Sequence, residues 1–215
     1  MPRRYDCTDA ADRKHGLREA VSAIRRGDLV VLPTDTLYGV GADAFNKRAV
    51  GDLLEAKGRG RNMPSPVLVG SPNTLHGLVT GMTDSAWELV DAFWPGGLTL
   101  VARHQPSLTW DLGETRGTVA VRMPLHPVAL EVLKDFGPIA VSSANLTGEA
   151  APQDCDAAQR MLGDSVAVYL DGGPTPSDVP SSIVDITGDV PVLLRPGAVS
   201  EEELRSVVPD LETPH

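Results

Sequence analysis

Cysteine is scarce in this sequence of 215 residues, and so are aromatic side chains and long apolar runs. Cys7 and Cys155 stand alone, outside any Cys-X-X-Cys pair and without a nearby histidine, so we expect reduced thiols and no disulfide framework. No apolar stretch approaches the ~20 residues of a membrane span, and the charged start lacks the apolar segment of a secretory signal. These absences predict a cytoplasmic protein with no membrane partner.

Positive charge is also in deficit, because the formal net charge is −10. A protein that mainly grips a nucleic-acid backbone carries a basic surplus, so this balance weighs against a dedicated RNA-binding module. It still allows a local ATP site. The sequence has no GxxxxGK[ST] phosphate loop, no GxGxxG after a strand and no GxSxG elbow. Its histidines lack the spacing of metal ligands, so we expect no metal site built from protein side chains.

The pattern of apolar residues predicts short strands mixed with helices. Because aromatic residues make up only 4%, the core must consist mainly of Val, Leu, Ala and Ile. Strands are expected at 29–32, 67–69, 98–102, 118–123, 138–141, 166–170, 181–186 and 190–194. Helices are expected at 17–24, 49–54, 72–79, 84–93, 126–136, 154–162 and from 200 onward, with a loop at 34–41. This mixture indicates an α/β or α+β sheet covered by helices. We expect one domain over residues 1–208 and a frayed tail at 209–215.

Two arginines lie in apolar surroundings. Arg122 follows Val119-Ala120-Val121, and Arg195 follows Val192-Leu193-Leu194. A guanidinium in a low-dielectric place needs an anionic partner, which is either a protein carboxylate or an anionic ligand. Strand side chains alternate between faces, so Thr118 and Arg122 share one face, about 13 Å apart along the strand, and can serve opposite ends of one cavity.

Two loops are rich in groups that bind phosphate or ribose. Residues 57–66 include Lys57 and Arg59 and no acidic residue, and their glycines let backbone approach a ligand. The alternative is a solvated charged loop. Ser143 and Asn145 belong to a second loop, which follows an apolar strand at a usual location for ligand sites in open α/β sheets. A local Asx-type turn is the alternative there.

Seven short segments occur in the order found in YrdC-type threonylcarbamoyl-AMP synthases, and the sequence resembles that family from residue 33 to residue 197. The segments are Pro33-Thr34-Asp35-Thr36-Leu37-Tyr38-Gly39-Val40-Gly41, Lys57-Gly58-Arg59, Trp94-Pro95-Gly96-Gly97-Leu98-Thr99, Thr118-Val119-Ala120-Val121-Arg122-Met123-Pro124, Ser143-Ala144-Asn145-Leu146-Thr147-Gly148, Ser181-Ser182-Ile183-Val184-Asp185 and Leu194-Arg195-Pro196-Gly197. The resemblance implies a twisted, mostly open mixed sheet with helices and a large basic cavity.

The same resemblance implies a nucleotidyltransferase reaction. Members of the family carboxylate the amino group of L-threonine with bicarbonate, and the carbamate attacks the α-phosphate of ATP so that pyrophosphate leaves. Mg²⁺ accompanies ATP, and no tightly bound organic cofactor is implied. A separate partner complex then transfers the threonylcarbamoyl group to tRNA, with which the synthase itself makes at most a transient contact.

The resemblance also assigns roles to individual residues. The L-threonine site is expected to contain Thr36, Arg122 and Ser181, with Arg122 on the carboxylate. The ATP site is expected to contain Lys57, Arg59, Thr118, Ser143, Asn145 and Arg195. Among these, Lys57 and Arg59 are the expected catalytic residues, and they face the triphosphate together with Arg195.

The sequence departs from the family pattern at several positions. Gly60, Met63 and Leu68 stand where proline, asparagine and histidine are frequent, and Ser142 and Ala151 replace a common proline and serine. Two other functions remain open from the sequence. One is a non-catalytic RNA-binding module of the same fold, and the other is a carbamoyl-transfer domain of the hydrogenase-maturation type.

Overall fold

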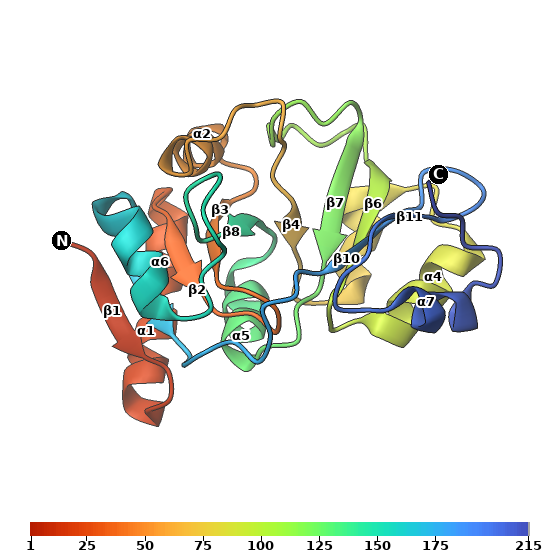
Figure 1. Ribbon diagram of the computed structural model, residues 1–215. Coiled ribbons are helices and arrows are strands. Elements are labelled where there is room, and N and C mark those ends of the chain that lie inside the picture. Colours follow the sequence, from red (N-terminus) through yellow and green to blue (C-terminus); the bar gives the residue numbers. More distant parts are fainter. Residues whose placement is uncertain (215) are drawn as a thin grey trace.

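The computed structural model describes residues 1–214, which form one large mixed sheet with helices on both faces (Figure 1). The strands are β1 (Arg3–Asp6), β2 (Val30–Leu32), β3 (Gly39–Asp43), β4 (Val67–Leu68), β5 (Val79–Thr80), β6 (Leu98–His104), β7 (Thr118–Arg122), β8 (Ile139–Ser143), β9 (Val168–Asp171), β10 (Ser182–Asp185) and β11 (Val192–Arg195). The helices are α1 (Ala10–Arg26), α2 (Lys47–Ala56), α3 (Leu75–Leu78), α4 (Asp84–Phe93), α5 (Pro127–Phe136), α6 (Cys155–Leu162) and α7 (Glu201–Val207), with short 3₁₀ turns at Pro72–Thr74 and Gly163–Ser165. The twisted mixed sheet expected from the sequence is confirmed.

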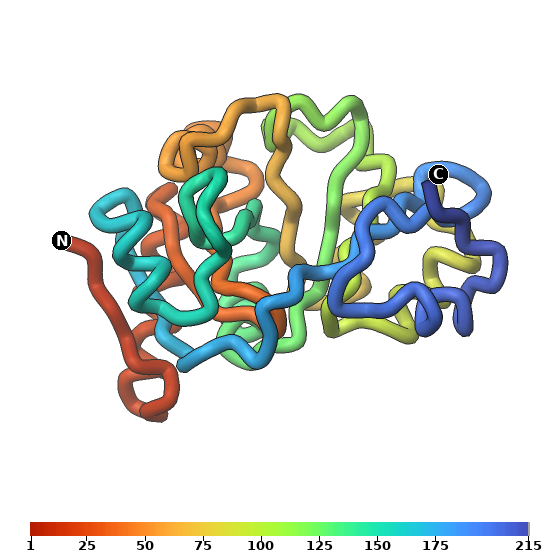
Figure 2. The backbone as a smooth tube through the Cα atoms, in the orientation of Figure 1, coloured from red at the N-terminus to blue at the C-terminus, as the bar shows by residue number. Residues whose placement is uncertain are grey.

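The strand order is β1-β9-β2-β3-β8-β4-β7-β6-β10-β11, and β5 pairs with β6. The sheet combines parallel pairs, such as β4 with β7 and β6 with β10, and antiparallel pairs, such as β3 with β8 and β6 with β7. β9 and β10 follow each other in the chain but lie near opposite ends of this order, so the segment 172–181 must cross the sheet. Figure 2 shows this blue segment passing from the N-terminal half to the half that contains β6 and β7.

Local sequence signals explain where the helices begin and end. Asp9 caps α1 by accepting hydrogen bonds from the backbone N–H groups of Ala11 and Asp12. Gly27 ends the same helix with a φ of 84°, a conformation that favours glycine. At α7, Ser200 and Glu203 form a reciprocal capping box.

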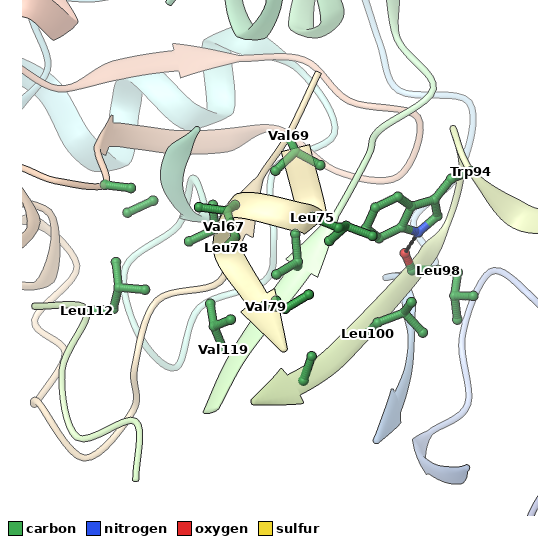
Figure 3. Close-up of a cluster of buried hydrophobic side chains, with 14 of the residues drawn as sticks. Val67, Val69, Leu75, Leu78, Val79, Trp94, Leu98, Leu100, Leu112 and Val119 are labelled. Atoms are coloured by element: carbon green, nitrogen blue, oxygen red, sulfur yellow. Dashed lines mark hydrogen bonds between the residues drawn. The ribbon is translucent and has the colours of Figure 1, made fainter. Parts of the chain in front are cut away.

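The buried apolar side chains form two clusters on opposite faces of the sheet. Val30 and Leu32 of β2 belong to the cluster that contains α1 and α5, whereas Val31 belongs to the cluster that contains α2, α4, α6 and α7. This alternation follows from the two-residue period of a strand. In the second cluster, Trp94 lies beside Leu98 and donates its indole N–H to the Leu98 carbonyl oxygen over 2.8 Å (Figure 3).

Three parts of the sequence prediction need correction. Residues 34–41 were expected to form a loop, but Gly39–Asp43 form β3, a strand that its glycines conceal because glycine is depleted in strands. The strands β1 and β5 were not predicted either. Residues 72–79 are not one helix, because a 3₁₀ turn and the four-residue α3 precede β5 at Val79.

The chain after Pro209 was expected to fray, and this expectation is wrong as far as Glu212. Leu211 is 1% exposed and packs in the second cluster. The backbone N–H of Glu212 donates to the Pro191 carbonyl oxygen, and the Glu212 carbonyl oxygen accepts from the N–H of Leu193. The end of the chain is therefore held along β11 by one buried side chain and two hydrogen bonds.

The packing of α4 gives a stability prediction. Leu89 is fully buried on this helix, so we expect Leu89→Ala to lower the free energy of unfolding by about 2 to 5 kcal/mol, through lost burial and a residual cavity. Denaturant unfolding followed by circular dichroism measures the change. Asp91→Ala, at an exposed position of the same helix, serves as the control and should shift stability by at most about 0.5 kcal/mol. A loss below about 1 kcal/mol for Leu89→Ala would contradict the described packing.

Candidate functional site

A cavity of about 350 Å³ is lined by residues of β3, β4, β6, β7, β8, β10 and β11 and of adjoining loops. It is lined by Thr34, Thr36, Leu37, Tyr38, Gly39, Arg59, Pro64, Pro66, Leu68, Thr99, Ala120, Arg122, Val141, Ser142, Ser143, Pro180, Ser181, Ile183 and Arg195. The charged residues in this lining are three arginines, and no carboxylate is among the described residues that line it. The basic cavity expected from the sequence is therefore present.

The sheet register explains why residues far apart in sequence meet in this cavity. Thr99 of β6 pairs with Ile183 of β10, and Ile183 in turn pairs with Arg195 of β11. Paired residues on neighbouring strands present their side chains on the same face. Gly197 lets the chain after Arg195 pass close to β10, because a Cβ there would lie only 2.6 Å from the carbonyl carbon of Ser181.

Arg122 is fixed by three hydrogen bonds from its guanidinium group. Nε donates to the Gly96 carbonyl oxygen over 2.9 Å, Nη1 to Thr36 Oγ1 over 2.8 Å, and Nη2 to Asp35 Oδ1 over 2.6 Å. Burial lowers the pKa of Arg122, and the charge of Asp35 opposes that shift. The sequence left open whether a carboxylate of the protein or a ligand pairs with Arg122. The structure shows a protein carboxylate, and three of the five guanidinium N–H donors are used.

The other two arginines of the cavity have no carboxylate within salt-bridge distance among the described residues. Arg59 Nη1 donates to Ser142 Oγ over 2.9 Å, and Arg59 Nε is buried without a hydrogen-bond partner in the described part of the chain. Arg195 Nη2 donates to the Ser181 carbonyl oxygen over 2.6 Å. Burial lowers the pKa of both guanidinium groups, since it disfavours their charge. The cavity therefore carries positive charge that the neighbouring side chains do not neutralise.

Lys57 lies behind this cavity and does not line it. Its Nζ donates to the carbonyl oxygens of Ser143 and Asn145, so it holds the loop after β8. Burial, with a smaller contribution from the charge of Arg59, lowers the pKa of Lys57 to about 8. The side chain is therefore mostly a cation at pH 7 and loses its proton as pH rises through about 8.

The structure brings together most of the residues that the sequence selected. Thr36, Arg59, Arg122, Ser143, Ser181 and Arg195 all line the cavity. Thr118 and Asn145 are not among the described lining residues, so the lining does not support the expectation that Thr118 and Arg122 serve opposite ends of one cavity. Thr118 Oγ1 donates to the Thr115 carbonyl oxygen, and Asn145 Nδ2 donates to Glu149 in its own loop. The nucleotide-binding roles of Lys57, Thr118 and Asn145 stay predictions.

Sequence reasoning assigned no individual role to several polar residues of the site. Thr99 Oγ1 and Ser181 Oγ lie 2.8 Å apart, and Ser142 holds Arg59. Asp35 holds Arg122 from outside the lining. Thr99 and Asp35 both lie within the quoted sequence segments, so their position in these segments was the available signal.

A larger hollow of about 840 Å³ lies apart from this cavity, between α1, α2 and the turn before β9. Its arginines are each paired with a carboxylate, in the pairs Arg3–Glu19, Arg26–Asp28 and Arg48–Asp52. The two charges within each exposed pair neutralise each other, so little net electrostatic attraction remains for a ligand. The smaller cavity with unneutralised arginines is the better candidate.

Residues 1–214 hold neither a metal-binding cluster nor a membrane-spanning helix. No group of three or more His, Cys, Asp and Glu side chains is arranged to hold a metal ion there. Within the same range, every helix is too short or too polar to cross a membrane.

Comparison with known proteins identifies relatives along most of the chain. The model of the family Sua5/YciO/YrdC, described as "Telomere recombination", matches residues 22–197. A Mycobacterium tuberculosis protein, provisionally named a threonylcarbamoyl-AMP synthase, is 56% identical over 208 residues, which cover 97% of this chain and 96% of that protein. The threonylcarbamoyl-AMP synthase of Bacillus subtilis is 38% identical over 194 residues, which cover 89% of this chain and 56% of that longer protein.

Solved structures give the same result. The structure of Sua5 from Pyrococcus abyssi in complex with L-threonine matches with a TM-score of 0.92 and 33% identity. The match covers 100% of this chain and 62% of that one, so the chain spans less than two thirds of the archaeal protein. On the match of its sequence, its fold and the order of its motifs, this chain belongs to the Sua5/YciO/YrdC family.

Proposed function

We propose that this protein is a threonylcarbamoyl-AMP synthase, a nucleotidyltransferase that joins L-threonine, bicarbonate and ATP. The observation that carries the proposal is the cavity in which Arg59 and Arg195 have no carboxylate partner among residues 1–214, while Arg122 is held beside them. A site with surplus positive charge and several hydroxyl groups suits an amino-acid carboxylate together with a triphosphate. The names of the relatives described above agree with this function.

The L-threonine subsite is proposed at Thr36, Arg122 and Ser181, which all line the cavity. Arg122 keeps two N–H donors beyond its three protein contacts, and a guanidinium can bind a carboxylate through two parallel hydrogen bonds. Ser181 Oγ lies within hydrogen-bond distance of Thr99 Oγ1 and accepts from Arg195 over 3.3 Å. These groups bind and orient the amino acid.

The ATP subsite is proposed around Arg59, Ser143 and Arg195, with Lys57 holding Ser143 at the end of β8 and the loop that follows it. The two unneutralised guanidinium groups would bind phosphate oxygens. We propose that Mg²⁺ arrives with ATP and is held by its phosphate oxygens, because carboxylate ligands are missing from the described lining. The metal would neutralise part of the triphosphate charge.

The proposed chemistry needs no covalent enzyme intermediate. Bicarbonate condenses with the amino group of threonine to give a carbamate and water. A carbamate oxygen forms the new bond to the α-phosphorus of ATP while the bond to the β-phosphate oxygen breaks, and pyrophosphate takes that electron pair. Arg59 and Arg195 would stabilise the charge that develops on the leaving pyrophosphate, so catalysis rests on positioning and electrostatics.

The product would leave for a tRNA-modifying partner. A mixed carbamic–phosphoric anhydride such as threonylcarbamoyl-AMP is an activated carbamoyl donor, so its consumer must be a carbamoyl-type transferase, here the proposed threonylcarbamoyl-transfer complex acting on tRNA. The free thiols Cys7 and Cys155 suit the proposed cytoplasmic location. The acidic pI of about 4.9 disfavours a dedicated RNA-binding module.

The first prediction concerns the product. Incubation of the purified protein with L-threonine, bicarbonate, Mg²⁺ and ATP should give threonylcarbamoyl-AMP and pyrophosphate, detected by mass spectrometry. Omission of L-threonine should abolish pyrophosphate release. ATP cleavage that does not depend on threonine, or turnover of carbamoyl phosphate in its place, would refute the proposed function.

The second prediction concerns Arg59. Because its guanidinium is half-buried in the cavity and unneutralised, Arg59→Ala should cost more than about 2 kcal/mol of transition-state stabilisation, about 30-fold in kcat/KM. Arg61→Ala is the matched control, because Arg61 lies in the same loop but is exposed and pairs with Asp111. Equal activity of the two variants would show that Arg59 has no special role.

The third prediction concerns pH. Because burial lowers the pKa of Lys57 to about 8, the free enzyme loses this cation as pH rises through 8. We therefore expect kcat/KM for ATP, measured at saturating threonine, to fall above pH of about 8. Lys57→Arg, whose side chain stays charged, should lack this fall. A wild-type profile that stays flat to pH of about 9.5 would contradict a role for the Lys57 charge.

A further inference from the structure

Asp35 holds the key arginine of the cavity without lining the cavity itself. Its Oδ1 accepts from Arg122 Nη2 over 2.6 Å and from the backbone N–H of Leu125 over 2.8 Å. The side chains of Arg122 and Asp35 are only 9% and 14% exposed, so this ion pair is shielded from water. A shielded pair is lost at a high cost when one partner is removed.

The contacts of Arg122 fix the plane of its guanidinium group. Nε donates its hydrogen to the Gly96 carbonyl oxygen. Nη1 donates one of its two hydrogens to Thr36 Oγ1, and Nη2 donates one of its two to Asp35 Oδ1. The three partners come from three separate segments of the chain. With the plane fixed, the remaining hydrogens of Nη1 and Nη2 have defined directions, and planar two-point recognition of a carboxylate depends on such directions.

We infer that Asp35 is a positioning residue that orients Arg122 for recognition of the carboxylate of the amino-acid substrate. The inference rests on the proposed function and deepens it. Asp35 also neutralises the charge of Arg122, so the surplus charge of the cavity lies with Arg59 and Arg195. The amino acid is then recognised by directed hydrogen bonds, whereas the triphosphate is attracted by net charge.

The contact with Leu125 gives Asp35 a second task. Leu125 lies in the turn between β7 and α5, so one carboxylate oxygen joins the loop before β3 to both the last residue of β7 and the turn that follows. Because both bonds go to the same oxygen, the amide oxygen of an asparagine can accept them as well. Asp35→Asn therefore removes the charge and keeps the geometry, whereas Asp35→Ala removes both.

The experiment compares Asp35→Ala, Asp35→Asn and the control Asp43→Ala. Asp43 is also a partly buried carboxylate that accepts a backbone N–H, from Phe45 over 2.9 Å, but it does not contact the cavity. For Asp35→Ala we expect KM for L-threonine to rise at least about tenfold while KM for ATP changes less than about twofold. Asp35→Asn should stay within about threefold of the wild type for L-threonine, and the control within about twofold.

Binding of L-threonine amide supplies a readout that a merely structural role would not change. The wild type should bind L-threonine more tightly than the amide, and Asp35→Ala should lose most of that preference. Equal weakening of both ligands, an unchanged KM in Asp35→Ala, or a loss in Asp35→Asn as large as in Asp35→Ala would overturn the inference. Thermal unfolding and the ATP KM report whether each variant is folded. A wild type that neither binds nor turns over L-threonine would instead refute the proposed function.

Discussion

The site depends on holding positively charged guanidinium groups in a cavity that is partly shielded from water. Three guanidinium groups line one cavity, and Asp35 neutralises only that of Arg122. Burial disfavours the charge of Arg59 and Arg195 and therefore costs free energy. An anionic ligand bound in the cavity beside these two groups would lower their electrostatic free energy and offset that cost.

The sheet is what brings these charges together. Arg59 comes from the loop before β4, Arg122 from the end of β7 and Arg195 from the end of β11. The long segment 172–181 crosses the sheet between β9 and β10 and brings Pro180 and Ser181 to the cavity. A site assembled from so many segments depends on the whole fold, which is why apolar clusters on both faces matter for function.

The sequence allowed much of this to be predicted, for identifiable reasons. Apolar runs such as residues 29–32 predicted buried strands. Arg122 and Arg195 were identified as candidates because charged residues are rare in such runs. β3 was missed because glycines weaken its pattern, and the docked end near Leu211 was missed because one buried side chain gives no periodicity. The pairing of Asp35 with Arg122 spans 87 positions, and no local rule reveals a contact of that range.

The most direct test of the proposed site is a crystal structure with L-threonine and a non-hydrolysable ATP analogue bound together. We expect both ligands to share the cavity, with the threonine carboxylate on Arg122 and phosphate oxygens on Arg59 and Arg195. A nucleotide bound in the hollow between α1 and α2, or a carboxylate that does not contact Arg122, would contradict it.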